Sequence, residues 1–349
     1  MKTFLYSVMT GENNSLLAGL MRPLLFILSF VYRAGVRVIY WLYEAGILKS
    51  VKVDKPVISI GNITAGGVGK TPFVIFLAKY LYDRMKHPVI LTRGYMDNDD
   101  ALSDEAMMMR QVLPQVPVVV SPDRVLAARE ALHDHIVDVF LLDDGFQHWK
   151  MARDLDVVLI DAANPFGNGQ LLPAGILREP LEALERAHIF VITRADIAKD
   201  LPALRGELNR RNPQATIAEI TQTPVSLSNL FTNEVFKDFS PLKGRVLACA
   251  AIGAPRPFLM SLEKLGATVE HAEIFNDHYV YNPEDIQKMV SICREKKIKL
   301  IATTHKDAVK MINFQNLFGD VSVIVVNIAV NVIRGENELF SRINSVLSS

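Results

Sequence analysis

Residues 57–72 read Val-Ile-Ser-Ile-Gly-Asn-Ile-Thr-Ala-Gly-Gly-Val-Gly-Lys-Thr-Pro, and this stretch decides the fold. The apolar run 57–60 precedes the glycine-rich segment, and residues 73–82 continue with a helical pattern. A strand, a glycine-rich loop, Gly-Lys-Thr and a helix in this order form a phosphate-binding loop, or P-loop. Glycines let backbone N–H groups turn toward phosphate oxygens, while the start of the helix and Lys70 supply positive charge.

This loop predicts a site for the phosphates of ATP, in which Lys70 also has a catalytic role and the Thr71 hydroxyl is directed to Mg²⁺. The pattern departs from the usual one because Thr64 stands where the first glycine is expected. The three glycines that follow leave the loop free to wrap a phosphate. The residues predicted to bind nucleotide are Thr64, Ala65, Gly66, Gly67, Val68, Gly69, Lys70 and Thr71.

A second motif, 139–148, reads Val-Phe-Leu-Leu-Asp-Asp-Gly-Phe-Gln-His. Four apolar residues lead to acids at a strand end, which is where a Walker B carboxylate holds Mg²⁺ directly or through water. Asp143 and Asp144 are therefore predicted metal ligands, with the choice between them left open. Gln147 and His148 are candidate substrate or nucleotide contacts.

Further candidates follow other strand ends. Arg93 is a candidate for a phosphate contact, and Arg178 lies in a long loop rich in glycine and proline, 164–180, of the kind that often serves a site. One of the acids between 97 and 105 could accept a proton from an attacking hydroxyl, although composition does not say which one. An acid beside a histidine, at 277–278, is a second candidate for proton handling.

Short apolar runs alternate with helical stretches from residue 57 onward, which predicts an α/β fold with a parallel, doubly wound sheet of the P-loop NTPase type. The expected strands of the first domain are 57–60, 88–92, 116–120, 139–142, 157–161 and 189–193. The pattern loosens near 222–243 and then resumes. We therefore expect a P-loop domain at 49–221, a hinge at 222–243 and a smaller α/β domain at 244–349.

The segment 1–48 is strongly apolar, but arginines at 22, 33 and 37 interrupt its longest runs. On a helical wheel, Ser29, Arg33, Arg37, Tyr40 and Glu44 share one narrow face. This layout predicts an amphipathic helix that lies in a membrane interface, with its arginines toward acidic headgroups. A helix packed on the protein's own core is the alternative.

The formal net charge is zero, which argues against nucleic acid as a partner. The two cysteines, Cys249 and Cys293, lack the spacing of metal ligands and are expected to be buried thiols in a reducing compartment.

Taken together, these motifs resemble the tetraacyldisaccharide 4′-kinase (lipid A 4′-kinase) family. The resemblance covers about residues 15–310. The matching segments, in the family's order, are 61–72, 93–95, 143–148, 172–180, 277–279 and 303–310.

The resemblance implies a kinase that transfers the γ-phosphate of ATP, with Mg²⁺, to the 4′-hydroxyl of an acylated glucosamine disaccharide 1-phosphate and forms lipid IVA. It implies two α/β domains with a two-stranded linker, which close around the nucleotide at the cytoplasmic face of the inner membrane. It also implies a catalytic pair, here Asp104 and His278. The segments around them depart from the family pattern, with Ser103 and Ala106 beside Asp104 and His305 in Thr-Thr-His-Lys-Asp.

A rival interpretation is a GTPase switch at the membrane periphery. Residues 193–196, Thr-Arg-Ala-Asp, resemble the guanine-reading segment [NT]-K-x-D, with arginine in place of lysine.

Overall fold

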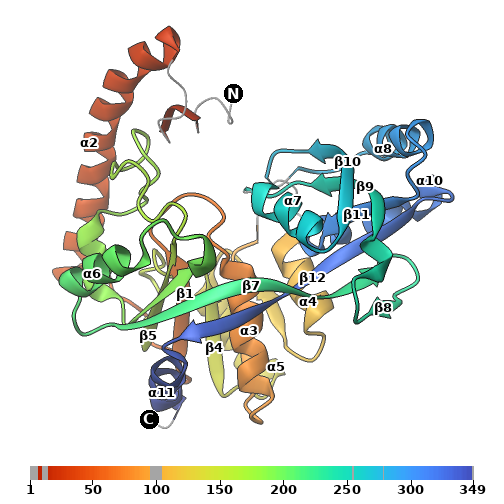
Figure 1. Ribbon diagram of the computed structural model, residues 1–349. Helices are drawn as coiled ribbons and strands as arrows, with labels where there is room; N and C mark the ends of the chain where they lie inside the picture. Colours follow the sequence, from red (N-terminus) through yellow and green to blue (C-terminus); the bar gives the residue numbers. More distant parts are fainter. Residues whose placement is uncertain (1–6, 10–14, 95–103, 254, 278, 348–349) are drawn as a thin grey trace. The chain divides into compact units, whose positions relative to one another are not determined.

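The computed structural model describes residues 7–9, 15–94, 104–253, 255–277 and 279–347 (Figure 1). These residues form two compact units that interleave along the chain. Unit 1 holds the described residues up to Gly94, then Leu113–Thr221 and everything from Val330 onward. Unit 2 holds Gln222–Ala329 together with the helix α4 (Asp104–Val112).

The sheet of unit 1 is built from parallel strands in the order β3-β2-β4-β1-β5-β6-β7. Their bounds are β1 (Val57–Asn62), β2 (Pro88–Thr92), β3 (Val118–Val120), β4 (Val139–Asp143), β5 (Leu155–Asp161), β6 (Ile189–Thr193) and β7 (Thr216–Asn229). In the middle of the sheet, Val57 of β1 pairs with Phe140 of β4, and Ile58 pairs with Leu155 of β5. The chain leaves β1 toward β2 on one side and leaves β4 toward β5 on the other. Such a switch point opens a crevice at the carboxyl ends of the strands, where ligands bind.

The central strands are continuous apolar runs because both faces of the sheet are covered. Every residue of β1, β2, β4 and β6 is buried. The covering helices and short 3₁₀ turns are α3 (Lys70–Tyr82), α5 (Arg124–Asp134), η1 (Leu181–Arg186), η2 (Ala195–Ile197), α6 (Leu201–Arg211) and α11 (Glu336–Leu347). Two hydrophobic clusters result, one centred on Phe146, Phe190 and Ile192 and the other on Val57, Phe140 and Leu142.

Unit 2 has its own hydrophobic clusters around the parallel strand order β10-β9-β11-β12. The strands are β9 (Gly244–Ala250), β10 (Ala267–Ile274), β11 (Leu300–Thr304) and β12 (Ser322–Arg334), and a short β8 (Val235–Phe236) pairs with β7. The helical elements are η3 (Ser240–Leu242), α7 (Pro255–Lys264), α8 (Pro283–Glu295), α9 (His305–Met311), η4 (Ile312–Phe314) and α10 (Gln315–Phe318). Helix α4 packs against α9.

The expected fold class, a mostly parallel α/β architecture with a P-loop and an apolar N-terminal helix, is confirmed. Some elements differ from expectation. Residues 222–229, expected to be a loose hinge, belong to the long strand β7, which runs from unit 1 into unit 2. Strand β12 runs from unit 2 into unit 1, and α11 follows it there. The sequence did not predict β7, because small and polar residues interrupt its apolar ones and leave no continuous apolar run.

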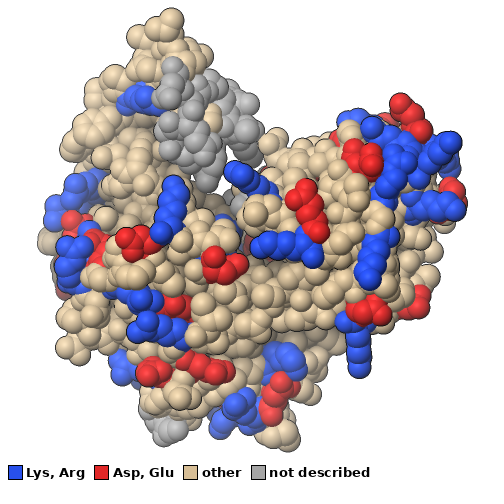
Figure 2. Space-filling model, in the orientation of Figure 1, with Lys and Arg blue, Asp and Glu red and all other residues tan. Residues whose placement is uncertain are grey.

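The N-terminal helix α2 (Leu16–Glu44) exposes most of its apolar side chains, whereas a helix of a water-soluble domain buries them. Ala18, Leu25 and Ser29 are buried, whereas many of its largest apolar side chains are exposed. These exposed residues include Leu16, Leu20, Leu24, Ile27, Phe30, Val31, Val38 and Trp41. Figure 1 shows α2 standing away from the sheet of unit 1, and in Figure 2 the same region is almost free of charged side chains.

By length and composition α2 could cross a membrane, and it is the single described helix that meets this test. Part of its polar face does not point to headgroups as expected. Tyr32 and Tyr40 instead form hydrogen bonds to the body of unit 1, and Arg33 lies 4.0 Å from Glu182. Arg33 and Glu182 are both well exposed, so the orientation of the arginines toward headgroups stays a prediction.

Candidate functional site

The P-loop joins the carboxyl end of β1 to the first turn of α3. Gly66 and Gly69 have φ angles of 120° and 87°, and Gly69 is the N-cap of α3. Side chains with a Cβ rarely adopt these angles, which explains the glycines. The N–H of Ala65 donates to the carbonyl of Ile176 at 2.6 Å, so the amides beyond it, from Gly66 to Thr71, are left to form the phosphate cradle.

The ammonium group of Lys70 lies at the mouth of this loop between two oxygen atoms. Its Nζ is 2.9 Å from Oδ1 of Asn62 and 3.2 Å from Oδ1 of Asp144. The Arg178 guanidinium binds the same carboxylate, at 2.8 Å from Oδ1 and 3.0 Å from Oδ2. Asp144 thus brings two cations, from the P-loop and from the loop that ends at Arg178, to the same point.

Asp144 remains a carboxylate because of these neighbours. Burial by itself would raise the pKa of Asp144, but Lys70 and Arg178 outweigh burial and lower the pKa from 3.8 to about 2. Its backbone has a φ of 51°, in the left-handed region. The turn after β4 therefore holds Asp144 in an uncommon conformation that carries its side chain to Lys70.

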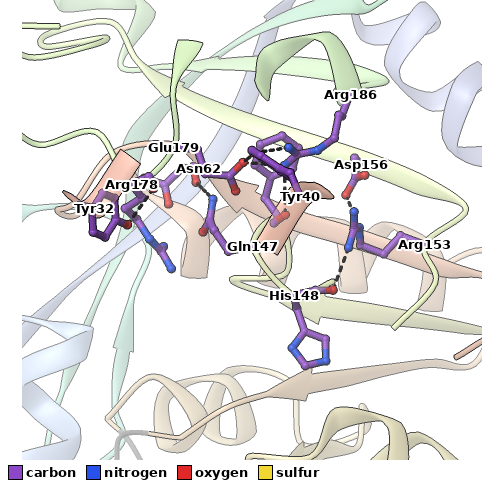
Figure 3. A network of polar contacts seen from close by, with 11 residues as sticks. Tyr32, Tyr40, Asn62, Gln147, His148, Arg153, Asp156, Arg178, Glu179 and Arg186 are labelled. Carbon is purple, nitrogen blue, oxygen red and sulfur yellow. Dashed lines mark hydrogen bonds and ion pairs between the residues drawn. The ribbon is translucent and has the colours of Figure 1, made fainter. Parts of the chain in front are cut away.

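Asn62, the last residue of β1, organises the P-loop from beneath. Its side-chain amide donates to the carbonyl and hydroxyl oxygens of Thr64, at 2.6 and 3.1 Å. The backbone carbonyl of Asn62 accepts a hydrogen bond of 2.9 Å from Nε2 of Gln147, a contact that Figure 3 shows. Gln147, expected to contact substrate or nucleotide, therefore binds the end of β1. Asn62, which belongs to no sequence motif named above, binds the ammonium of Lys70.

Asp143 ends β4 and is almost fully buried, with Oδ2 accepting a hydrogen bond of 3.2 Å from the Thr92 hydroxyl. Gly145 follows the two acids. A Cβ at Gly145 would come within 2.8 Å of Leu142 and Ser59 atoms, so the turn after the acids packs directly on β1 and β4. The two carboxylates are fixed at the strand end by this close packing.

Three more basic or titratable groups lie near the acids. The buried Arg124, at the start of α5, interacts electrostatically with Arg93 and with both Asp143 and Asp144, and its burial lowers its pKa. His148 is held neutral, because burial and the nearby Arg124 and Arg153 lower its pKa to about 4. In Figure 3 the His148 ring points away from Asn62 and Gln147.

The loop that carries Arg178 also anchors α2. Tyr32 donates to the carbonyl of Arg178 at 2.8 Å, and Tyr40 hydrogen-bonds to Glu179 and Arg186. Arg186 pairs with Glu179 at 2.8 Å and stacks on the rings of Trp149 and Phe146, 4.2 and 4.4 Å from their centroids. Figure 3 shows Tyr40, Glu179 and Arg186 converging beside Gln147. Helix α2 and the P-loop site are therefore both in contact with the loop that carries Arg178.

Unit 2 carries the other expected pair in part. Asp104 is the first residue of α4, and its Oδ2 lies 2.8 Å from Nζ of Lys310 on α9. Lys306, on the same helix as Lys310, pairs with Asp277 at 2.8 Å. His278 lies outside the described residues, as do Tyr95 and the acids at 97, 99 and 100.

Comparison with known proteins identifies the family. The model of the family described as tetraacyldisaccharide-1-P 4′-kinase matches residues 21–348. The tetraacyldisaccharide 4′-kinase of Halothermothrix orenii is 36% identical over 339 residues, which cover 89% of this chain and 88% of that protein. The chain belongs to the tetraacyldisaccharide 4′-kinase family.

A second relative of the same name, from Elusimicrobium minutum, is 37% identical over 310 residues, which cover 83% of this chain and 82% of that protein. Among solved structures, LpxK from Aquifex aeolicus in complex with ATP matches with a TM-score of 0.73 at 30% identity, covering 94% of this chain and 99% of that one. The sequence-based prediction of a kinase of lipid A biosynthesis is thereby confirmed.

Residues 193–196, the segment that suggested a GTPase, support the P-loop in this member of the kinase family. Arg194 pairs with Asp161 at 2.6 Å and donates to the carbonyl of Gly67, and the Thr193 hydroxyl donates to the carbonyl of Val68 at 2.9 Å. These residues buttress the P-loop from behind. An arginine bound in this way is not placed to read a guanine base.

Proposed function

We propose that this chain transfers the γ-phosphate of ATP to the 4′-hydroxyl of tetraacyldisaccharide 1-phosphate, an acylated glucosamine disaccharide, and so forms lipid IVA. The observation that carries the proposal is the ammonium of Lys70, held between Asn62 and Asp144 at the mouth of a glycine loop. Phosphoryl transfer depends mostly on positioning and on stabilising the charge of the transferring group. A fixed cation beside loop amides supplies both.

In this proposal Lys70 and the amides from Gly66 to Thr71 bind the β- and γ-phosphates, and Thr64 and Ala65 form the start of the loop. Arg178 and Arg124 add positive charge on the same side, and Arg93, near Arg124, increases it. Arg178 exchanges its carboxylate partner for a phosphate oxygen when the nucleotide binds, because a guanidinium binds either group with the same two-pronged geometry. Gln147 and His148 then line the site rather than carry out chemistry.

The donor set also suits Mg²⁺. Thr71, Asp143 and Asp144 offer one hydroxyl and two carboxylates, and Mg²⁺ prefers a few such oxygens together with phosphates. The described residues contain no group of three His, Cys, Asp or Glu side chains that could hold a metal alone. Mg²⁺ held by the oxygens of Thr71, Asp143 and Asp144 would neutralise negative charge on the nucleotide phosphates.

We assign to Asp104, acting with His278, the role of accepting the proton from the attacking hydroxyl. A carboxylate within hydrogen-bond reach of the hydroxyl acts as a general base and contributes about 10²- to 10⁴-fold to the rate. The Asp104 carboxylate is held by Lys310 at 2.8 Å. The two roles fall on different units, with the phosphate cradle in unit 1 and the proton acceptor in unit 2.

We propose further that the protein is bound to the cytoplasmic face of the inner membrane through α2, in a peripheral or monotopic manner. A helix with its polar side on the protein and its apolar side exposed is stable where the surroundings are apolar. The acyl chains of the substrate lie in the same medium. Docking α2 on the loop of Arg178 brings the nucleotide site close to that surface.

One assay tests the proposal against its rivals. Purified protein is incubated with γ-labelled ATP or GTP and Mg²⁺, with and without the acylated disaccharide 1-phosphate in detergent micelles, and label on lipid is measured. We expect transfer from ATP that depends on the acceptor and is lost in Lys70→Ala. A preference for GTP with slow hydrolysis and no labelled lipid would instead identify a GTPase switch.

A further inference from the structure

Helix α9 carries two lysines one turn apart, and each contacts a segment that bears a proposed proton-handling residue. Nζ of Lys310 lies 2.8 Å from Oδ2 of Asp104, and Nζ of Lys306 lies 2.8 Å from Oδ1 of Asp277, the neighbour of His278. Residues four apart on a helix share one face, so both lysines point to the same side. All of these residues belong to unit 2.

Lys310 makes a second contact that ties the two segments together. The same Nζ donates to the carbonyl of Tyr279 at 3.0 Å, and the lysine side chain is only 7% exposed. An ammonium has three N–H donors, and two of them here reach chain segments that are about 175 residues apart in the sequence. Lys310 therefore bridges the start of α4 and the residue that follows His278.

Helix α9 is itself fixed by a buried carboxylate. Asp307 is fully buried and accepts hydrogen bonds from the Ala251 N–H at 3.1 Å, the Tyr281 hydroxyl at 3.1 Å and the Thr304 hydroxyl at 2.6 Å. Thr304 in turn caps the helix by accepting from the Asp307 N–H. These bonds join α9 to the ends of β9 and β11, so Lys306 and Lys310 project from a rigid base.

We propose that Lys310 is a positioning residue for the proton acceptor of the kinase, which it serves by orienting the Asp104 carboxylate. Lys306 holds the Asp277 carboxylate in the same way. The two lysines of α9 then form a bracket that fixes Asp104 and Asp277. This inference rests on the proposed assignment of Asp104 as the proton acceptor.

The chemistry favours this role over contact with a substrate phosphate. The Lys310 side chain is 7% exposed, against 20% for Lys70 of the P-loop, and its ammonium is already bound to a carboxylate and a carbonyl. Fixing one oxygen of the carboxylate also restricts its rotation, and small losses of alignment at a reacting atom cost large factors in rate.

The test compares Lys310→Met, which keeps length and packing but removes charge, with Lys310→Arg, which keeps the charge. Full-length protein is assayed with ATP, Mg²⁺ and acylated disaccharide 1-phosphate in detergent micelles. We expect kcat of Lys310→Met to fall about 30- to 100-fold with KM for ATP unchanged, and Lys310→Arg to recover at least about tenfold of this loss. A rise in KM for ATP with an unchanged kcat would overturn the proposal.

A double-mutant cycle separates positioning from general support of the fold. In an Asp104→Asn background, Lys310→Met should lower kcat by less than about threefold, because its effect passes through a carboxylate that is no longer there. Losses that multiply in the double variant would show that Lys310 acts independently of Asp104 and would overturn the proposal. If Lys310→Met does not fold, Lys310→Gln keeps a donor for the Tyr279 carbonyl and takes its place in the same cycle.

The outcomes distinguish this inference from the proposed function. If wild-type protein puts no label on lipid, the proposed reaction is wrong whatever Lys310 does. If wild type is active and Asp104→Asn retains its turnover, the assignment of Asp104 is wrong, and the positioning role falls with it. If Asp104→Asn lowers kcat to a value that is still measurable and Lys310→Met lowers it further by its full factor, only the positioning role is wrong.

Discussion

At the scale of single residues, positive charges outnumber negative charges around the P-loop. Lys70, Arg178, Arg124 and Arg93 gather around two carboxylates, Asp143 and Asp144. Four positive charges against two negative ones leave a surplus that a triphosphate neutralises. Asp144 keeps two of the cations in place, which means that the site is organised for a polyanion before it arrives.

Asn62 is the residue whose importance the structure reveals most directly. Asn62→Ala removes the acceptor for Lys70 and the donor to Thr64, so we expect kcat/KM for ATP to fall about 10- to 100-fold, which corresponds to about 1.4 to 2.8 kcal/mol. Steady-state kinetics with varied ATP measure the change. Asn62→Asp retains an acceptor for Lys70 and should lose less, and equal losses in both variants would show that Lys70 does not depend on this contact.

Asp144 gives the protein a specific acid sensitivity. Its folded-state pKa of about 2 lies below its ordinary value of 3.8, so its ion pairs stabilise the folded state fully above about pH 4 and this contribution is lost as the pH falls toward 2. The side chain is 36% exposed, so solvent screens part of the energy. Urea unfolding at pH 2 to 5 checks this. The difference in unfolding free energy between wild type and Asp144→Asn should narrow as the pH falls, and a constant difference would contradict the assignment.

At the scale of elements, α2 is the helix whose surroundings explain its sequence. Its polar residues include Tyr32 and Tyr40, which bond to the loop that carries Arg178, while its apolar side chains remain exposed. Glu179, whose side chain is 3% exposed, has its pKa raised by burial, which Arg186 partly offsets. A buried carboxylate with one cationic partner makes this junction sensitive to the loss of either member.

Loosening this junction should be visible in backbone exchange. In the double variant Tyr32→Phe/Tyr40→Phe, three hydrogen bonds between α2 and the body of unit 1 are lost, each contributing about 1 kcal/mol. We expect amide hydrogen exchange in residues 32–44 to become about tenfold faster or more. Tyr43→Phe is the matched control, because it keeps the ring that packs on Trp149. Unchanged exchange in the double variant would mean that the apolar contacts alone hold the helix.

The apolar face of α2 should set membrane affinity. Leu24 and Ile27 are 57% and 62% exposed, so replacing both with Glu removes apolar surface without disturbing the docked side. Each substitution costs about 2 to 3 kcal/mol of transfer free energy, so partitioning into vesicles of bacterial lipids should fall by at least about 100-fold. Vesicle sedimentation measures it. Full retention by the vesicles would assign membrane contact to another surface.

At the scale of the whole molecule, two units divide the work, and β7 and β12 run between them. Unit 1 holds the P-loop, both acids after β4 and the apolar helix α2. Unit 2 holds Asp104 and the bracket of lysines on α9. In the proposed function, phosphate binding belongs to unit 1 and proton handling to unit 2, so substitutions in the two units should affect nucleotide binding differently.

Binding of ATP should therefore stabilise the molecule through unit 1. At about 100 times its dissociation constant, ATP with Mg²⁺ adds about 2.7 kcal/mol, which raises Tm by roughly 5 to 10 °C for a unit of this size. Differential scanning calorimetry measures the shift. Lys70→Ala should lose most of it and Asp104→Asn should keep it. A shift that depends on Asp104 instead would place the nucleotide elsewhere.

The sequence allowed much of this molecule to be predicted, because local patterns carry their own physics. The glycines and Lys70 of the P-loop, the apolar strands and the acids after β4 follow from backbone freedom, burial and charge within a few neighbouring residues. The long strand β7 escaped prediction because polar residues interrupt its apolar ones. Helix α11 was within reach of prediction, because Leu339 and Ile343, both buried, have the spacing of an amphipathic helix. Arg124 is invisible as a motif, since one arginine at a helix start has no local signature.

The chain by itself determined that a glycine-rich loop with Lys70 follows the first strand, that the sheet is parallel and that an apolar helix precedes it, because each depends on contacts within a short stretch. Only the tertiary structure decided the partners of the charged groups. Asp144 holds Lys70 and Arg178, Arg194 supports the loop instead of reading a base, and Lys310 reaches Asp104 across about 200 residues of chain. Those pairings depend on which strand ends and helices meet in space, and the long-range packing that brings them together leaves no mark on neighbouring residues.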